Sequence, residues 1–481
     1  MSQKRAGEEH NPRGQPQVAM EAACQGGLTN LQASVVIAAG LAFCLGVTYH
    51  WGFLNGFTRL THYEWAWRDL GILKTAALLF APFAGIVWVL WRIEKEKSPA
   101  HPWLLLGLLA LANFFLQALG MLADPRGFQL VGEIVASPKA TSYFTDAMAI
   151  QRPLEWLAHF HNAELGLHSA THPPGPILFY YLFFKLLGPY AGALIGGCAV
   201  GLIGSVGILV IYRFTVLWTA DQRVRLTASG FYTLLPALTV FFPEFDQVYP
   251  ILSMLLMLFW VQAVDTSQEI SKYAFYTGAI LFVATFFAYN LLLVGAFMAY
   301  YGLYWLWRQK WTWPASALFL RTSGIVLGVC AGLHAALWLA SGYNPIASFG
   351  HAMSTQARFA ADMKRPYAIF AMLDPYDFFL GAGIIALPIL ALHLQRLLTR
   401  FDAKRMDTAL TLIGLGTILT VDLSGLLRGE VARVWLFLQP LLVVPVAGEI
   451  SGLSWPWKLS IFALQWWIVA CLKATMSFVN P

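Results

Sequence analysis

Long apolar runs are the feature that most restricts what this chain can fold into. A membrane-spanning helix needs about 20 apolar residues in succession, and runs of this kind, some a little short, recur along most of the sequence. They cover residues 32–50, 71–91, 103–122, 190–212, 226–242, 249–264, 273–289, 291–307, 322–340, 377–394, 408–425, 435–449 and 458–475. The pattern predicts an all-α polytopic membrane protein with about 13 transmembrane helices.

Charge is scarce enough to exclude several classes of protein. Only 12% of the residues are charged and 58% are hydrophobic, whereas a soluble globular protein has about 25% charged residues. So few charges cannot cover the water-facing surface of a 481-residue globule. An ordinary cytosolic enzyme, a nucleic-acid-binding protein and a disordered chain are therefore excluded, and membrane lipids are the expected surroundings.

Lysine and arginine indicate the topology. With the N-terminus inside, the short inner loops hold the basic clusters at 92–97, 213–225, 308–310 and 396–405. This is the distribution that the positive-inside rule describes. The polar residues 1–30 are expected to form a disordered cytoplasmic tail. The apolar piece 176–187 is too short to cross, and counting it as a span would invert every later loop, so an interfacial or re-entrant helix is expected there.

Two predicted outer segments, roughly 123–175 and 341–376, are longer than simple connections require. The first carries five carboxylates and four histidines. Asp146 lies at the start of a stretch, 144–160, with helical periodicity. It has two interpretations: a residue that favours the positive end of a helix, or a general base made more basic by partial burial at the membrane surface.

His172 begins a His-Pro-Pro-Gly sequence that opens the short apolar helix. The two prolines fix the backbone where a helix begins, so His172 is either part of a rigid entry turn or a functional side chain. Lys185 follows within this apolar helix. A lysine there either extends to ordinary headgroups or pairs with an anion such as a lipid phosphate.

An acidic residue in the first large outer loop, then His-Pro-Pro, then a short apolar helix with a lysine, resembles the GT-C glycosyltransferase superfamily. The nearest likeness is to protein O-mannosyltransferases and lipid A aminoarabinose transferases. The stretch from Gly188-Pro189 to Tyr212-Arg213 is similar to the next helix of that family. Asp246, in Phe-Pro-Glu-Phe-Asp, matches the family's second acidic residue. The family usually has an Asp-Glu pair at the first acidic site, whereas Ala147 follows Asp146 here.

The resemblance divides the chain into four parts. After the tail, 31–102 supplies two extra N-terminal transmembrane helices, and 103–310 forms a GT-C-like core with the catalytic outer loop 123–189. The remainder, 311–481, contributes C-terminal transmembrane helices and the outer loop 341–376.

A short outer loop near the C-terminal end holds Arg428 and Arg433. These arginines either pair internally within an interfacial loop or hold a phosphate or pyrophosphate, for which a guanidinium is well shaped. In the second case, Arg433 and Lys185 neutralise a leaving phosphate.

These features together predict an integral-membrane glycosyltransferase that moves a sugar from a polyprenyl-phosphate donor to an unidentified acceptor. The expected location is a bacterial inner (plasma) membrane, with the active site on the outer side. Asp146 is the expected base, Asp246 orients the acceptor, and His172 completes the catalytic set. Carboxylates with His172 are ligands that a divalent metal ion accepts, but no spacing requires one, so a metal stays open. The alternative is a secondary transporter or lipid flippase, whose charges would lie near the bilayer midplane.

Overall fold

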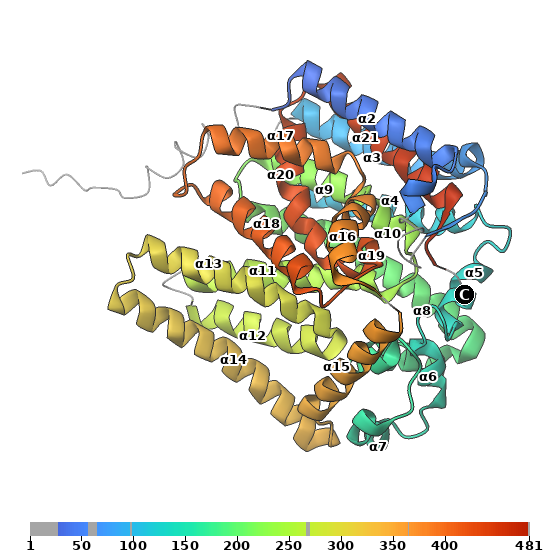
Figure 1. Ribbon diagram of the computed structural model, residues 1–481, viewed down its shortest axis with the longest axis vertical. Coiled ribbons are helices and arrows are strands. Elements are labelled where there is room, and N and C mark those ends of the chain that lie inside the picture. The colour runs from blue at the N-terminus through green and yellow to red at the C-terminus, as the bar shows by residue number, and fades with distance from the viewer. Residues whose placement is uncertain (1–26, 56–64, 97–98, 266–269, 364, 480–481) are drawn as a thin grey trace, which may run out of the picture.

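The computed structural model describes residues 27–55, 65–96, 99–265, 270–363 and 365–479, and this part of the chain is almost entirely helical (Figure 1). The helices are α2 (Asn30–Thr48), α3 (Ile72–Glu96), α4 (Pro102–Met121), α5 (Gln129–Ala136), α6 (Tyr143–Ala149), α7 (Pro153–Ala158), α8 (Gly175–Phe214), α9 (Gln222–Thr233), α10 (Pro236–Val240), α11 (Tyr249–Asp265), α12 (Ile270–Phe287), α13 (Val294–Arg308), α14 (Trp313–Ser341), α15 (Pro345–Asp362), α16 (Tyr367–Ala382), α17 (Ala386–Thr399), α18 (Met406–Ser424), α19 (Val431–Val434), α20 (Gln439–Ser451) and α21 (Trp455–Thr475). Two short strands, β1 (Ala66–Trp67) and β2 (Met476–Ser477), pair antiparallel.

The predicted class is confirmed: the chain is an all-α, multi-pass membrane protein. Eight helices in the described part of the chain are long and apolar enough to cross a membrane, or nine if α16 and α17, which meet at 104°, form one broken span. The count of 13 is not confirmed. Some apolar runs form shorter pieces; 226–242, for example, is divided into α9 and α10 because Pro236 starts a new helix.

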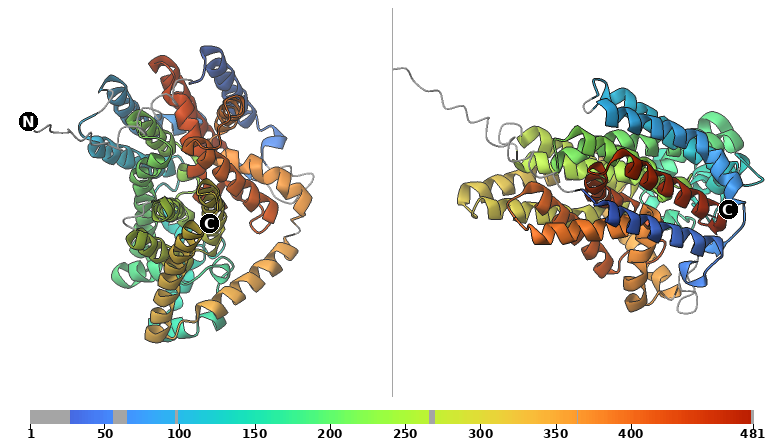
Figure 2. Two further views of the ribbon diagram at one scale, coloured as in Figure 1. Left: turned by 90° about the vertical axis from the view of Figure 1, so that its left-hand side faces the viewer. Right: turned by 90° about the horizontal axis from the view of Figure 1, so that it is seen from above.

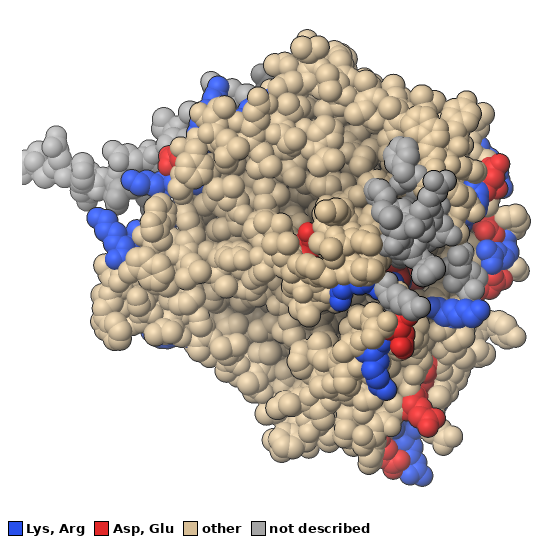
Figure 3. Space-filling model, viewed as in Figure 1, with Lys and Arg blue, Asp and Glu red and all other residues tan. Residues whose placement is uncertain are grey.

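Most long helices run along the same direction (Figure 2, right). The predicted basic loops lie at one end, which we call the basic end. Hydrogen bonds join residues in these loops to residues beside the neighbouring loops: Gln222 to Pro99, Trp218 to Thr411, and Lys404 to Tyr304. Residues 122–174, 342–366 and 425–434 lie toward the other end, which we call the loop end, with α5, α6, α7 and α15 (Figure 1). Charged side chains on the face in Figure 3 gather toward these ends and leave a wide uncharged band between them.

Helix α8 contains a sharp reversal at Gly188. This residue has φ 76° and ψ −177°, a conformation that a side chain would strain. A Cβ on Gly192 would lie 2.8 Å from the carbonyl oxygen of Phe183, so the two halves of α8 pack closely against each other. The piece 176–187 is thus one arm of a helical hairpin, and its interfacial or re-entrant position stays a prediction.

The predicted outer loop 123–189 contains α5, α6, α7 and the first arm of α8. The expectation of a single helical stretch over 144–160 is wrong. Helix α6 ends at Ala149, and α7 begins only at Pro153, because proline disfavours helical backbone at the residue before it. Arg152 accordingly has the extended angles φ −125° and ψ 100°.

The N-terminal helix pair is joined to the C-terminal part of the chain. Helix α2 packs mainly against α21, while α3 packs against both α21 and α4. The β1–β2 pair fastens the segment before α3 to the segment after α21. Most of the predicted tail, residues 1–26, lies outside the described residues; Thr29 already caps α2 through Gln32.

Replacing Gly192 with alanine is expected to destabilise the α8 hairpin. The new methyl group would meet backbone atoms of Phe183 and Phe184 at 2.8–3.1 Å, and overpacking of this kind costs about 1–3 kcal/mol. Thermal unfolding of the purified protein in detergent measures the effect. Gly107→Ala in α4 is the control, since its Cβ would meet nothing within 4 Å; an equal loss of Tm in both variants would contradict the tight hairpin.

Candidate functional site

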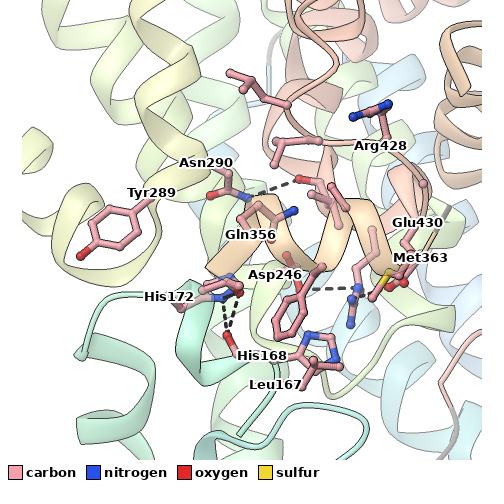
Figure 4. Close-up of a pocket in the computed structure, with 18 of the residues that line it drawn as sticks. Leu167, His168, His172, Asp246, Tyr289, Asn290, Gln356, Met363, Arg428 and Glu430 are labelled. Atoms are coloured by element: carbon pink, nitrogen blue, oxygen red, sulfur yellow. Dashed lines mark hydrogen bonds and ion pairs between the residues drawn. The ribbon is translucent and has the colours of Figure 1, made fainter. Parts of the chain in front are cut away.

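A cavity of about 420 Å³ opens at the loop end and combines polar and apolar walls (Figure 4). Six segments that are distant in the sequence form it: 140–143, 167–172, 244–246, 289–293, 349–365 and 425–434. The apolar wall includes Leu292, Phe349, Met353, Leu426 and Leu427. The cavity therefore has both an apolar wall and a cluster of charged side chains.

Arg433 is the centre of the charged wall. Its guanidinium lies 2.6 Å from the carboxylate of Glu430, 3.3 Å from that of Glu244 and 3.8 Å from that of Asp246. The Arg433 side chain is only 11% exposed. A buried charge of this kind is stable only when it is paired, so Arg433 joins the loop before α19 to the turn before α11.

Two carboxyl groups beside Arg433 are shifted in opposite directions. Burial raises the pKa of Glu244 to about 8, although Arg433 opposes the shift. Burial also disfavours the charged form of Glu430, but Arg433 and Arg365 outweigh it and lower the pKa of that group. At neutral pH Glu244 is therefore mainly protonated, while Glu430 is ionised.

Two further arginines that line the cavity donate to each other's backbone carbonyl groups. Arg365 donates to the carbonyl of Arg428 and lies 3.2 Å from the carboxylate of Glu430, while Arg428 donates to the carbonyl of Arg365 at 2.7 Å. Arg428 also donates to the carbonyl of Gly425 at 2.9 Å. Within the described part of the chain, no carboxylate pairs with Arg428, so its positive charge is held by neutral carbonyl groups.

Helix α16 fixes the loop that carries Glu430 and Arg433. Asp374 accepts a hydrogen bond from the Gly429 amide at 3.0 Å, and Asp377, one turn later, accepts from the Ala432 amide at 3.1 Å. Glu430 has φ 56°, in the left-handed region that a non-glycine residue seldom adopts. Strain of this kind persists only where surrounding contacts impose it, as the two aspartates do here.

The cavity also holds two histidines that are neutral at pH 7. Burial, and then the charge of Arg433, lower the pKa of His168 to about 4. Burial also lowers the pKa of His172, although Asp246 opposes it. The Nδ1 atom of His172 lies 2.8 Å from the His168 carbonyl. A carbonyl oxygen can only accept, so Nδ1 carries the proton and Nε2 is the acceptor atom of the ring.

The structure brings four of the six predicted site residues together. Asp246, His172, Arg428 and Arg433 all line the cavity. They come from the turn before α11, the entry to α8, the loop between α18 and α19, and α19 itself. Asp146 and Lys185 are not among its lining residues.

Asp146 lies one turn after the cavity residue Tyr143 on α6. Its carboxylate accepts a hydrogen bond from the Gly166 amide at 3.0 Å. Burial raises the pKa of this group, against the hydrogen bonds from Ser169 and Gly166. In this structure Asp146 connects α6 to the segment that precedes His172.

Lys185 is exposed on the first arm of α8. Its ammonium group lies 5.4 Å from the ring centre of Tyr181 and 5.6 Å from that of Phe184. These are contacts of a cation with neighbouring aromatic rings, as expected for a lysine that extends toward the membrane surface.

Sequence reasoning missed several cavity residues. Two of them lie next to predicted site residues. Glu244 is two residues before Asp246, and Glu430 is three residues before Arg433. Gln356 belongs to the second long loop, where no motif separates it from other polar residues. Asn290 lies at a break between two apolar runs, and no other sequence feature marks it as a site residue.

The residues present do not fit a metal ion well. Arg433 already occupies the position among Glu244, Asp246 and Glu430 in which a cation would neutralise these carboxylates. In the described part of the chain, no three His, Cys, Asp or Glu side chains are grouped to hold a metal.

No protein-family model matches the chain, and a search of the curated proteins found no relative.

Replacing Glu244 with glutamine is expected to flatten the dependence of stability on pH. A carboxyl group with a raised pKa holds its proton more tightly in the folded protein. The stability that it contributes is fully present below its ordinary pKa of 4.5 and is lost as the pH rises to about 8. Between about pH 5 and pH 9 the Tm of the wild type should therefore fall more steeply than that of the variant.

Glu133→Gln is the matched control, because Glu133 is an exposed carboxylate paired with Arg126 at the same end of the molecule. Equal slopes for wild type and Glu244→Gln would show that Glu244 does not hold a proton in the folded state.

Proposed function

We propose that this protein is an integral-membrane glycosyltransferase with a GT-C-like core. It transfers a sugar from a polyprenyl-phosphate donor to an acceptor at the loop end, which we assign to the outer face of a bacterial inner membrane. The observation that carries the proposal is the cavity itself, where Arg428 and Arg433 share one space with Asp246, His172 and an apolar wall.

The balance of charge in the cavity favours an anionic ligand. Arg365, Arg428 and Arg433 supply three positive charges. Asp246 and Glu430 supply two negative charges when ionised, and Glu244 is mainly protonated. Three positive against two negative charges leave an excess of one positive charge, which suits a phosphate group, and guanidinium groups bind phosphate in a directed way.

The apolar wall accounts for the rest of such a donor. Phe349 and Met353 of α15, together with Leu426 and Leu427, line the cavity. A polyprenyl chain lying against these side chains leaves water, which stabilises the complex in proportion to the apolar area buried. The phosphate would then lie at the boundary between the apolar wall and the arginines.

Transfer needs one base and one stabilised leaving group. The acceptor oxygen or nitrogen attacks the anomeric carbon, and the bond from that carbon to the phosphate oxygen breaks. The acceptor proton passes to Asp246, whose carboxylate lies 3.8 Å from the guanidinium of Arg433. Arg428 and Arg433 stabilise the released polyprenyl phosphate, and the neutral His172 orients the sugar or the acceptor through Nε2.

The alternative, a transporter or flippase, expects charges on broken helices at the bilayer midplane. The polar cavity residues instead lie at helix entries and exits: His172 just before α8, Asp246 just before α11, Asn290 just before α13 and Arg433 beyond α18. This position favours chemistry at a membrane surface.

The direct test uses purified protein in detergent with a panel of polyprenyl-phosphate sugars labelled in the sugar, and a membrane extract as the source of acceptor. We expect release of polyprenyl phosphate together with transfer of label to a new product. If no donor is consumed while labelled donor crosses proteoliposome membranes, the carrier alternative is correct.

Asp246→Asn is expected to lower kcat by about 10²–10⁴-fold, because the amide cannot accept the acceptor proton. The Tm should stay close to that of the wild type, since asparagine keeps the shape of the side chain. Turnover in the labelled-donor assay measures kcat.

Asp146→Asn separates the two candidate bases. If Asp246 is the base, Asp146→Asn keeps most of the activity, because Asp146 lies outside the cavity lining and bonds to Gly166. Loss of turnover in Asp146→Asn with normal turnover in Asp246→Asn would restore the prediction made from the sequence.

Arg428→Gln is expected to raise the KM for the donor about tenfold, the effect of losing one charge-assisted hydrogen bond. The same substitution of Lys185 should leave this KM unchanged, because Lys185 is exposed and outside the cavity lining. Initial rates at varied donor concentration measure both. A larger effect at Lys185 would contradict this assignment of the phosphate site.

A further inference from the structure

A second cavity, of about 430 Å³, lies between helices near the basic end, far along the bundle from the first. The first turn of α4, the last turns of α8, the second half of α11 and the start of α12 supply its walls. We call it the α8–α11 groove. Its lining residues are mainly apolar: Trp103, Leu209, Val210, Arg213, Val216, Leu255, Leu258, Phe259, Gln262 and Tyr273.

Arg213 is the charged residue among the groove's lining side chains. It is exposed, and its guanidinium lies 4.8 Å from the ring centre of Trp103. Within the described residues, no carboxylate lies within ion-pair distance of Arg213, whereas most arginines of the first cavity are paired. The groove is therefore apolar and has the positive charge of Arg213 at its side.

Arg213 has a second cation near it. Arg225 lies 3.9 Å from the ring centre of Tyr212, the residue before Arg213, and is within electrostatic reach of Arg213. Trp103 and Tyr273 are the residue types that concentrate where lipid headgroups begin.

We propose that the α8–α11 groove binds an anionic glycerophospholipid from the leaflet at the basic end, with its phosphate on Arg213 and one acyl chain on the Leu209–Leu255–Leu258 wall. Gln262 and Tyr273 face the glycerol and ester region. Basic pockets between membrane helices at this level are a known way to hold anionic headgroups.

The charges decide between an anionic and a zwitterionic lipid. A zwitterionic headgroup would bring a cation of its own close to Arg213 and Arg225, and the like charges would repel, whereas an anionic headgroup is attracted by both arginines. One basic residue near the surface contributes a factor of about five to the affinity for an anionic lipid. The occupant is taken from the surrounding leaflet, because Trp103 and Val216 are exposed at the edge of the groove.

The test measures binding of dioleoylphosphatidylglycerol and dioleoylphosphatidylcholine to the delipidated full chain by native mass spectrometry. We expect phosphatidylglycerol to bind more tightly, and Arg213→Gln to weaken its binding about fivefold while binding of phosphatidylcholine changes little. Leu255→Trp fills the groove and should weaken binding of both lipids.

Arg308→Gln is the matched control. Arg308 is also exposed, in the last turn of its helix at the basic end, and lies 5.9 Å from the ring centre of Tyr304, but it does not line the groove. This variant should bind phosphatidylglycerol as the wild type does.

Three results would overturn the proposal. The first is equal binding of the two lipids to the wild type, and the second is an equal loss in Arg213→Gln and Arg308→Gln. The third is a polyprenyl phosphate that competes with phosphatidylglycerol for the groove and depends more strongly on Arg213, because the groove would then serve the donor. None of these outcomes depends on sugar transfer, so this proposal and the proposed function fail separately.

Discussion

The buried guanidinium of Arg433 joins two distant segments at the loop end, the loop before α19 and the turn before α11. Arg433 pairs with Glu430 in its own loop and with Glu244 and Asp246 before α11. Without this cation, up to three carboxylates would face one another away from water. Burying unpaired charges in this way has a large free-energy cost. The lowered pKa of Glu430 and the position of Asp246 beside the cavity follow from this pairing.

Rigid helices support this pairing from two sides. Asp374 and Asp377 of α16 hold the backbone amides of the Arg433 loop, so the guanidinium is placed by a helix and does not depend on a free loop. On the opposite side, the α8 hairpin fixes the entry at which His172 stands. The apolar helices therefore act as a frame that positions a small polar centre, as is usual for sites built on connections between rigid elements.

The sequence alone predicted the helical membrane class and four residues of the cavity, because these depend on local hydropathy, charge and proline. It did not predict that Pro236 divides the run 226–242 into two short helices. It also did not predict the division of 144–160 at Pro153, because helical hydropathy continues across this proline. It also ranked Asp146 above Asp246. Which of two carboxylates faces a cavity depends on the rotation of short helices, and Asp146 bonds to the Gly166 amide outside the cavity lining. Glu244 was missed because pairing across distant segments leaves no trace in spacing.

The β1–β2 pair has a consequence for how the protein is assembled. Ala66 and Trp67 find their strand partners in Met476 and Ser477, and α2 finds its main packing surface on α21. During synthesis the first helices enter the membrane long before these partners leave the ribosome. Helix α2 must therefore stand in the membrane with lipid against this apolar face until α21 replaces the lipid.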